Sequence, residues 1–303
     1  MSAVDKTNNL PTLDTLQMVI SDVDGTLLDK HHRFHFRTYR AMKYIREKYP
    51  NFPIVLATGK QRSAVDLIRI PLDLDAFPAA HVNGCVLYNK GKIVYADHLK
   101  PEVVMEVVEA TKGNPNIANV VYDEHYVYAL TPGREDMKNV KRLAEIGEKV
   151  DFSMPCEEAI EKVKSGEIKV IKMAVCEDPD KLDVVRDILG KFPREKFATT
   201  QALEFCIELI PSNSNKGTAL QYITSNILPE VKNENVISFG DGQNDLSMFA
   251  IAGWSVAIKN GMPIAIEKAK AVSRVGNEEG AVGEVLERIF NIPEDYTPPP
   301  YTF

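Results

Sequence analysis

The segment Met18-Val-Ile-Ser-Asp22-Val-Asp24-Gly25-Thr26 determines how the rest of the chain is interpreted. Its apolar start predicts a buried strand that ends in a polar turn. Two carboxylates placed two residues apart share one face of a strand, and a turn that begins at Gly25 redirects the second one. The segment therefore predicts one acid that attacks a substrate and another that moves protons. The alternative is a turn that only terminates the strand, because Asp, Gly and Thr are all good turn residues.

The same design recurs along the chain. Two further apolar runs end in polar turns, namely residues 54–57 before Thr58-Gly59 and residues 79–82 before Asn83-Gly84. Apolar side chains at helical spacing cover residues 38–49. Strands that alternate with helices predict right-handed crossovers and a parallel sheet that binds ligands at the carboxyl ends of its strands. We therefore expect three polar strand ends to meet at one edge of an α/β core.

The pattern changes after residue 85. Residues 86–95 predict a hairpin, because a polar Asn-Lys-Gly turn separates two apolar-aromatic arms. Further elements follow, with strands expected at 119–123, 126–129, 169–175 and 203–210, helices at 102–110 and 180–189, and a return of parallel-type strands at 236–240 and 254–258. We therefore expect an α+β domain at 86–211, inserted into a core made of residues 1–85 and 212–303.

A second acidic motif follows the strand expected at 236–240. Gly240-Asp241-Gly-Gln-Asn244-Asp245 adds two carboxylates and an amide to the same edge of the sheet. Four acids in a shielded cleft repel one another strongly, so the cluster predicts a hard cation with oxygen ligands, and magnesium is the metal we expect. The alternative is an Asx turn that caps the next helix, although capping does not need both acids.

Lys216 precedes a helical pattern at 218–227, whose amino end favours an anion. A cation there suits a phosphate group, while a solvated surface lysine is the alternative. Thr58 and Gly59 offer a hydroxyl and backbone N–H groups to a phosphoryl oxygen, or else form a simple turn.

The composition restricts the function further. The 303 residues carry a formal net charge of -7, which disfavours nucleic acid and anionic membrane surfaces as partners. No run of about 18 apolar residues occurs, and the N-terminal segment lacks the apolar core of a signal peptide. We therefore expect a cytoplasmic protein, with the nucleus as a second, additional location, and four reduced cysteines that serve packing. The proline-rich tail at 294–303 is expected to be loose or docked on the surface.

Taken in order, these motifs resemble those of the haloacid dehalogenase superfamily. The four are Asp-x-Asp-Gly-Thr at 22–26, Thr58-Gly59, Lys216-Gly217 and Gly-Asp-Gly-x-Asn-Asp at 240–245. The insert between the second and third motifs resembles the type IIB cap of the Cof-like sugar-phosphatase branch. The resemblance extends over nearly the whole chain and implies a Rossmann-like core with an inserted α+β cap.

The resemblance also implies roles for individual residues. Asp22 is implied to attack phosphorus and form an aspartyl-phosphate, while Asp24 protonates the leaving oxygen and later activates water. Magnesium is implied at the Asp22 carboxylate, the main-chain carbonyl of Asp24 and Asp241, with Asp245 supporting its waters. Lys216 is implied to be catalytic as well. The residues implied to contact phosphate or substrate are Thr58, Gly59, Lys60, Asn83, Gly84, Lys216 and Asn244.

Lys60 departs from the family pattern. Many Cof-like enzymes carry Arg after Thr-Gly, and a lysine keeps the charge but loses the two-pronged geometry. Arg62 is the nearby residue that we consider as a replacement.

The expected function is that of a magnesium-dependent phosphatase acting on small phosphorylated metabolites, such as sugar phosphates. One alternative is an intramolecular phosphotransferase similar to phosphomannomutase, but the compact fourth motif favours hydrolysis. Another is a non-catalytic binding protein on the same scaffold, which has no need for so costly a cluster of charges.

Two further patterns receive structural interpretations. His31, His32 and His35 invite a metal-site interpretation, which we reject because the segment is typical of an exposed loop without acidic or Cys partners at suitable spacing. The lysine-rich residues 164–172 are interleaved with acids and are therefore expected to form a solvated face.

Overall fold

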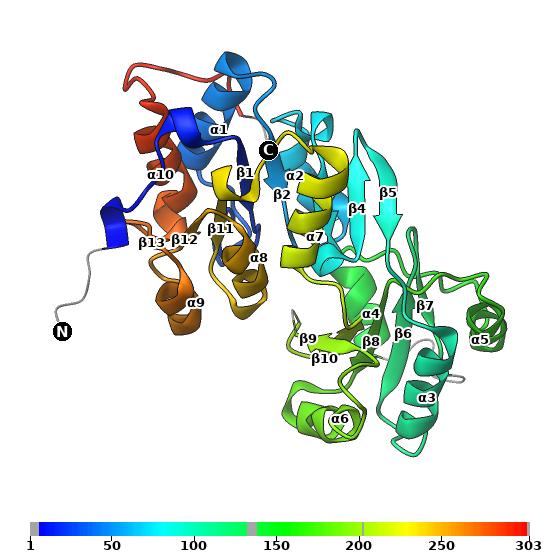
Figure 1. Ribbon diagram of the computed structural model, residues 1–303. Coiled ribbons are helices and arrows are strands. Elements are labelled where there is room, and N and C mark those ends of the chain that lie inside the picture. The colour runs from blue at the N-terminus through cyan, green and yellow to red at the C-terminus, as the bar shows by residue number, and fades with distance from the viewer. Residues whose placement is uncertain (1–5, 132–137, 202, 302–303) are drawn as a thin grey trace. The chain divides into compact units, whose positions relative to one another are not determined.

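The computed structural model describes residues 6–131, 138–201 and 203–301 (Figure 1). They form two compact units, one that contains the residues up to Tyr95 and from Asn215 onward, and one that spans Ala96–Ser214. The hairpin expected to begin the insert lies in the first unit as far as Tyr95. The assignment of 86–211 to an inserted domain stays a prediction.

A parallel five-stranded sheet forms the centre of the first unit. Its strands run in the order β13-β12-β11-β1-β2, and neighbouring strands are parallel. The strands are β1 (Met18–Ser21), β2 (Ile54–Leu56), β11 (Val236–Gly240), β12 (Trp254–Ala257) and β13 (Ala271–Val272). The predicted α/β core with a parallel sheet is confirmed, and β1 lies between the two strands that carry the other motifs.

Helices cover both faces of this sheet, which explains why its strands are continuously apolar. Successive side chains of β1 alternate between two cores: Val19 packs with residues of α1 and α10, whereas Met18 and Ile20 pack with α7, α8 and α9. The helices are α1 (Phe36–Lys48), α2 (Asp66–Arg69), α7 (Lys216–Tyr222), α8 (Leu246–Ile251), α9 (Pro263–Lys268) and α10 (Ala281–Phe290). A π-helical turn, Ile223–Ile227, continues α7.

A small three-stranded sheet extends the first unit. It consists of β3 (Ala79–His81), β4 (Val86–Asn89) and β5 (Lys92–Ala96), in that order. The strand expected at 79–82 is therefore present, but it pairs antiparallel with β4. A parallel bridge between Ala57 and Ala80 connects it to the end of β2.

The second unit is built on an antiparallel sheet with the strand order β7-β6-β8-β10-β9. Its strands are β6 (Ala118–Tyr122), β7 (Val127–Ala129), β8 (Lys172–Cys176), β9 (Ala198–Thr200) and β10 (Cys206–Ile210), and its helices are α3 (Pro101–Thr111), α4 (Lys138–Glu145), α5 (Cys156–Ser165) and α6 (Leu182–Leu189). Residues of α3, α5 and α6 pack on one face of the sheet, and α4 packs on the other together with Cys156 at the start of α5. The unit therefore has the α+β character expected from its sequence.

Lys172 corrects the interpretation of residues 164–172 as a solvated face. Lys164 is exposed, but Lys172, at the start of β8, is only 4% exposed. The Nζ atom of Lys172 lies 2.6 Å from Oε1 of Glu208 on β10 and 4.1 Å from the ring centre of Tyr122 on β6. The sheet buries this cation because neighbouring strands supply both a carboxylate and an aromatic face.

The four cysteines are buried and unbridged, and Cys176 and Cys206 lie opposite each other on neighbouring strands. Within the described ranges, no helix combines the length and the apolar character that a membrane span requires.

Candidate active site

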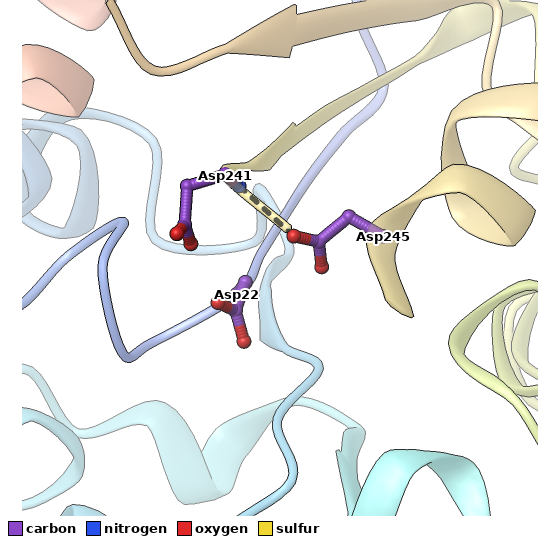
Figure 2. Close-up of side chains that lie close together, drawn as sticks. All are labelled: Asp22, Asp241 and Asp245. Carbon is purple, nitrogen blue, oxygen red and sulfur yellow. Dashed lines mark hydrogen bonds between the residues drawn. The ribbon is translucent and has the colours of Figure 1, made fainter. Parts of the chain in front are cut away.

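The acidic residues of the first and fourth motifs meet at the carboxyl edge of the parallel sheet. Asp22 follows β1, and its N–H donates to the Phe239 carbonyl of β11 at 3.0 Å. Asp241 comes directly after β11, so the two aspartates follow adjacent strand ends. Figure 2 shows the side chains of Asp22, Asp241 and Asp245 gathered around one point. Residues more than 200 positions apart in the chain are thus neighbours because parallel strands end at the same edge.

Asp22, Asp241 and Asp245 form a compact acidic cluster. A carboxylate oxygen from each lies within 4.8 Å of the others. Asp22 and Asp245 are buried, and Asp241 is half-buried. The Oδ2 atom of Asp245 accepts the N–H group of Asp241 at 2.9 Å (Figure 2). It also accepts the N–H group of Gly242 at 2.9 Å, and the two bonds fix the loop after β11.

Lys216 is the cation of this cluster and is completely buried. Its Nζ lies 2.5 Å from Oδ1 of Asp22 and 2.6 Å from Oδ1 of Asp245. Lys216 is the first residue of α7, which Asn215 caps by accepting the N–H of Thr218 at 2.9 Å. The cap fixes the helix start, and the helix start places the ammonium group between the two carboxylates.

The charges of the cluster are not balanced. Burial, with Asp245 and Asp241 nearby, raises the pKa of Asp22 well above its usual value although Lys216 opposes the shift. Burial and then Asp245 also raise the pKa of Asp241. Burial alone lowers the pKa of Lys216, but Asp22 and Asp245 outweigh it and raise that pKa. Three carboxylates against one ammonium group, with oxygen donors only, fit a hard divalent cation.

Gly25 is needed where the turn after β1 passes Asp241. Its φ of +77° lies in the left-handed region, and a Cβ atom there would stand 2.4 Å from Oδ2 of Asp241. The next residue, Thr26, donates its hydroxyl to Oδ1 of Asp241 at 2.9 Å. The glycine and the threonine of the first motif thus position an acid of the fourth motif.

Asp24 lies beside the cluster and is partly exposed. Its Oδ1 atom is 3.2 Å from Nζ of Lys60 and 3.3 Å from Nδ1 of His32. Arg62 instead pairs with Asp75 at 2.8 Å. The lysine that departs from the family pattern is therefore the cation that contacts Asp24, and Arg62 does not replace it in this structure.

The other residues expected to bind phosphate form a hydrogen-bonded loop layer. The Asn83 N–H donates to the Thr58 carbonyl at 2.8 Å, and the Lys60 N–H donates to the Thr58 hydroxyl at 3.1 Å. Asn244 donates to Oδ1 of Asn83 at 3.1 Å. Gly59 packs against this amide, since a Cβ atom there would lie 3.3 Å from Nδ2 of Asn83. Ala57 donates its N–H to the Ser21 carbonyl at 2.8 Å, so this layer begins beside Asp22.

Gly84 adopts a φ of +96°, and a Cβ atom there would lie 2.5 Å from the carbonyl oxygen of Asn215. Gly84, just before β4, and Asn215, the first residue after the second unit, therefore touch within the first unit.

Two residues that contact the acids of the site, Thr26 and His32, were not identified from the sequence. Thr26 had no assigned role, and His32 was assigned to an exposed loop. The three histidines serve different purposes: the N–H of His31 donates to Asp29 at 2.8 Å, His32 contacts Asp24, and Nδ1 of His35 accepts the Arg37 N–H at 3.1 Å and so caps α1. His32 lies outside the motif that contains Asp24, and nothing in the sequence around it indicates which residue it contacts. Only the fold reveals its contact with Asp24.

Comparisons with known proteins agree with these features. The sequence profile of the haloacid dehalogenase-like hydrolases matches residues 19–286. An uncharacterized hydrolase of Schizosaccharomyces pombe is 45% identical over 293 residues, which is 96% of each chain. The 5-amino-6-(5-phospho-D-ribitylamino)uracil phosphatase YwtE of Bacillus subtilis is 25% identical over 292 residues, covering 91% of this chain and 99% of its own. The solved structure of a sugar phosphatase of haloacid dehalogenase subclass IIB has a TM-score of 0.70 at 18% identity, covering 91% of this chain and 100% of its own.

Proposed function

Because the chain is an enzyme of the haloacid dehalogenase-like hydrolase family, as its motifs predict, we propose that it is a magnesium-dependent phosphatase of small phosphorylated metabolites. It hydrolyses phosphoric monoesters. The observation that carries this proposal is a buried carboxylate, Asp22, held 2.5 Å from a buried ammonium group, Lys216, beside two further acids. A carboxylate in that position is an oriented nucleophile, and its repulsion from a phosphate dianion is what the nearby cations offset.

The reaction proceeds in two displacements. An Asp22 oxygen forms a bond to phosphorus, the ester P–O bond breaks, and Asp24 gives its proton to the leaving oxygen. Asp24 then takes a proton from water, the resulting hydroxide attacks phosphorus, and the bond between Asp22 and phosphorus breaks to release inorganic phosphate. The partly exposed position of Asp24 supports this role, because its side chain is 42% exposed to solvent and that of Asp22 only 8%.

The Asp22 carboxylate, the Asp24 main-chain carbonyl, Asp241 and Asp245 are the groups that would hold magnesium. Bound there, the metal would offset the negative charge of the carboxylates and of the phosphate. The raised pKa values of Asp22 and Asp241 support this assignment, because these acids favour protonation when no cation offsets their charge.

The chain's own groups orient the phosphate. Lys216 neutralises one phosphoryl oxygen and keeps Asp22 aimed at phosphorus, because phosphoryl transfer depends on positioning and charge stabilisation. Further contacts to the phosphate or the substrate come from the loop layer, namely Thr58, Gly59, Lys60, Asn83, Gly84 and Asn244.

The substrate class is sugar-phosphate-like. Two of the similar proteins are named as phosphatases of a phosphoribityl compound and of sugars, and both extend over about nine tenths of this chain. The inserted domain expected at 86–211, which contains most of the second unit, acts as the cap that selects the substrate and excludes bulk water. The enzyme works in the cytoplasm.

The proposal is tested by the release of inorganic phosphate from an aryl phosphate. Turnover is expected to require magnesium and to fall below detection in Asp22→Asn, which keeps the shape of the side chain but removes the attacking carboxylate. Asp24→Asn is expected to slow turnover while magnesium affinity is retained, because the main-chain carbonyl remains.

Asp66→Asn is the matched control, since Asp66 lies in the same unit and pairs with Arg69 rather than with a motif residue. Its turnover is expected to stay within about twofold of the parent protein, as for most surface substitutions. Full turnover in Asp22→Asn would contradict covalent catalysis. Interconversion of two sugar phosphates without release of phosphate would instead identify a mutase. If the protein catalysed neither reaction, the non-catalytic binding protein would be the remaining alternative.

A further inference from the structure

The C-terminal segment, residues 293–301, is docked along α1 in the first unit (Figure 1). Arg40 of α1 donates hydrogen bonds to the main-chain carbonyls of Pro293, Glu294 and Tyr296 at the start of the segment. The Tyr39 hydroxyl donates to the Pro299 carbonyl at 3.2 Å. Of the two expectations for the proline-rich tail, docking is the one that the structure shows for residues up to 301.

Tyr301 joins the tail to three parts of the unit. Its ring stacks on Tyr39 of α1 with 4.5 Å between ring centres, and it meets the ring of Phe34 edge-on at 5.9 Å. Its hydroxyl donates to the carbonyl of Leu67 in α2. Aromatic pairs in these geometries each stabilise by about 0.5–1.5 kcal/mol beyond their burial. The tail therefore restrains α1, α2 and the residues that precede α1.

Phe34 ends a turn that starts at Asp24. Leu28 forms bridges with both Asp24 and Phe34, so the two ends of the turn are tied to the same residue. The carboxylate of Asp29 accepts the N–H groups of His31 and Arg33 at 2.8 and 3.0 Å. The turn is thus a defined structure, and Phe34, only 2% exposed, is its anchor in the core.

His32 stands at the tip of this turn in a conformation that needs support. Its φ of +56° lies in the left-handed region, which a non-glycine residue adopts at a cost and keeps only when its surroundings hold it. Its side chain is 68% exposed, so little packing acts on the ring itself. The restraint that keeps Nδ1 3.3 Å from Asp24 therefore comes from the backbone of the turn, which Asp29 holds from within and Phe34 anchors at its base.

We propose that Tyr301, at the end of the docked tail, is a positioning residue of the active site, which acts through Phe34 to hold His32 against Asp24. The proposal rests on the proposed function, because Asp24 is the proton-transfer residue of that reaction. The hydrogen bond from Tyr301 to the Leu67 carbonyl also helps to position Asp24. It restrains the segment that follows Lys60, which is the other neighbour of Asp24.

Tyr301→Ala is the first test, with an aryl phosphate as substrate and magnesium present. We expect kcat to fall about tenfold, because small displacements of a reacting group are costly. KM is expected to stay within about twofold, because the phosphate-binding residues are untouched. Tyr301→Phe keeps the ring contacts and loses only the hydroxyl, so it is expected to restore most of the lost kcat.

Tyr296→Ala is the matched control within the same tail. The Tyr296 ring packs on Tyr44 with 4.9 Å between centres, and its hydroxyl donates to Glu47 at 2.9 Å, both on α1 and away from the turn. We expect this variant to lower the melting temperature about as much as Tyr301→Ala while its kcat stays within about twofold. An equal loss of kcat in both variants would show a general loss of stability and overturn the proposal.

The route through His32 is tested by a double-mutant cycle. His32→Ala is expected to lower kcat about as much as Tyr301→Ala, and the double variant is expected to lose little more, because both changes break the same link. Losses that multiply would overturn the route.

Hydrogen exchange keeps the two proposals apart. Backbone amides of residues 28–35 are expected to exchange faster in Tyr301→Ala and not in Tyr296→Ala. If the parent protein releases no phosphate, the proposed function fails. The exchange measurement alone then decides whether Tyr301 holds the turn at residues 28–35. Equal exchange in the two variants would overturn this role of Tyr301.

Discussion

Among the described residues, two lysines are buried, and they have different surroundings. Lys172 in the second unit meets one carboxylate, Glu208, at 2.6 Å. Lys216 in the first unit meets two, Asp22 at 2.5 Å and Asp245 at 2.6 Å, with Asp241 beside them. In both places burial opposes the charged amine, and the carboxylates nevertheless raise the pKa of the lysine above its usual value.

The difference between them is one of charge balance. The pair of Lys172 and Glu208 is closed, because its charges cancel and Tyr122 covers the ammonium group. The cluster at Lys216 has more carboxylates than ammonium groups, and only a further cation offsets the excess. Burial of a lysine alone therefore does not mark a catalytic site, whereas an unbalanced charge cluster at a strand end supports the one proposed here.

Removal of the amine at position 216 is expected to have the largest effect. Lys216→Met should lower the turnover of an aryl phosphate about a thousandfold, because a buried cation next to the reacting groups is lost. Steady-state kinetics at saturating magnesium measures the change. Turnover within tenfold of the parent protein would make Lys216 a structural residue and remove the contrast with Lys172.

Removal of the amine at position 172 is expected to affect stability instead. Lys172→Met leaves Glu208 buried without its partner, which costs about 3–5 kcal/mol of the free energy of unfolding. Adding Glu208→Leu removes the orphaned charge and should recover most of this loss. Urea unfolding of both variants measures it, and a double variant no more stable than Lys172→Met would contradict the view of a closed pair.

The sequence predicted the parts of the molecule that local patterns encode. Continuous apolar runs that end in polar turns correctly predicted the parallel sheet of β1, β2 and β11. Since parallel strands end at one edge, the same patterns place Asp22 and Asp241 close together, and the structure has them there.

Contacts made by side chains far from any motif were not predictable in this way. Lys172 lies in a lysine-rich stretch, and its burial depends on register, because Tyr122 is its direct neighbour across the strands β6 and β8. The contact of His32 with Asp24 depends on a left-handed backbone conformation within the turn. Neither the register nor the turn has a local sequence signal, so tertiary structure decides both.

Magnesium is expected to stabilise the Lys216 cluster and to leave the Lys172 pair unaffected. A ligand at about 100 times its Kd stabilises the folded state by about 2.7 kcal/mol, which raises the melting temperature. Asp241→Asn should lose most of this shift, because it removes a proposed ligand. The variant with both Lys172→Met and Glu208→Leu should keep it. A melting temperature of the parent protein that does not respond to magnesium would contradict the metal site.

The smallest expected effect is the pH dependence of stability without metal. In EDTA the raised pKa values of Asp22 and Asp241 mean that the folded chain binds more protons than the unfolded chain at pH values above the usual carboxyl value of 3.8. The stability that these acids contribute is therefore fully present below that value and is lost as the pH rises through their raised pKa values. Each such proton contributes up to about 1.4 kcal/mol per pH unit to the slope.

Asp22→Asn separates this effect from the rest of the protein. The variant in EDTA should show a flatter decline in the free energy of unfolding than the parent protein as the pH rises above the usual carboxyl value of 3.8, because one of the two titrating acids is gone. Lys172 contributes nothing to this decline, since its pKa is raised from 10.5 and its stabilisation is lost only in alkaline solution. An equally steep decline in Asp22→Asn would mean that the excess charge does not reside at the Lys216 cluster, and the distinction between the two buried lysines would then lose its electrostatic basis.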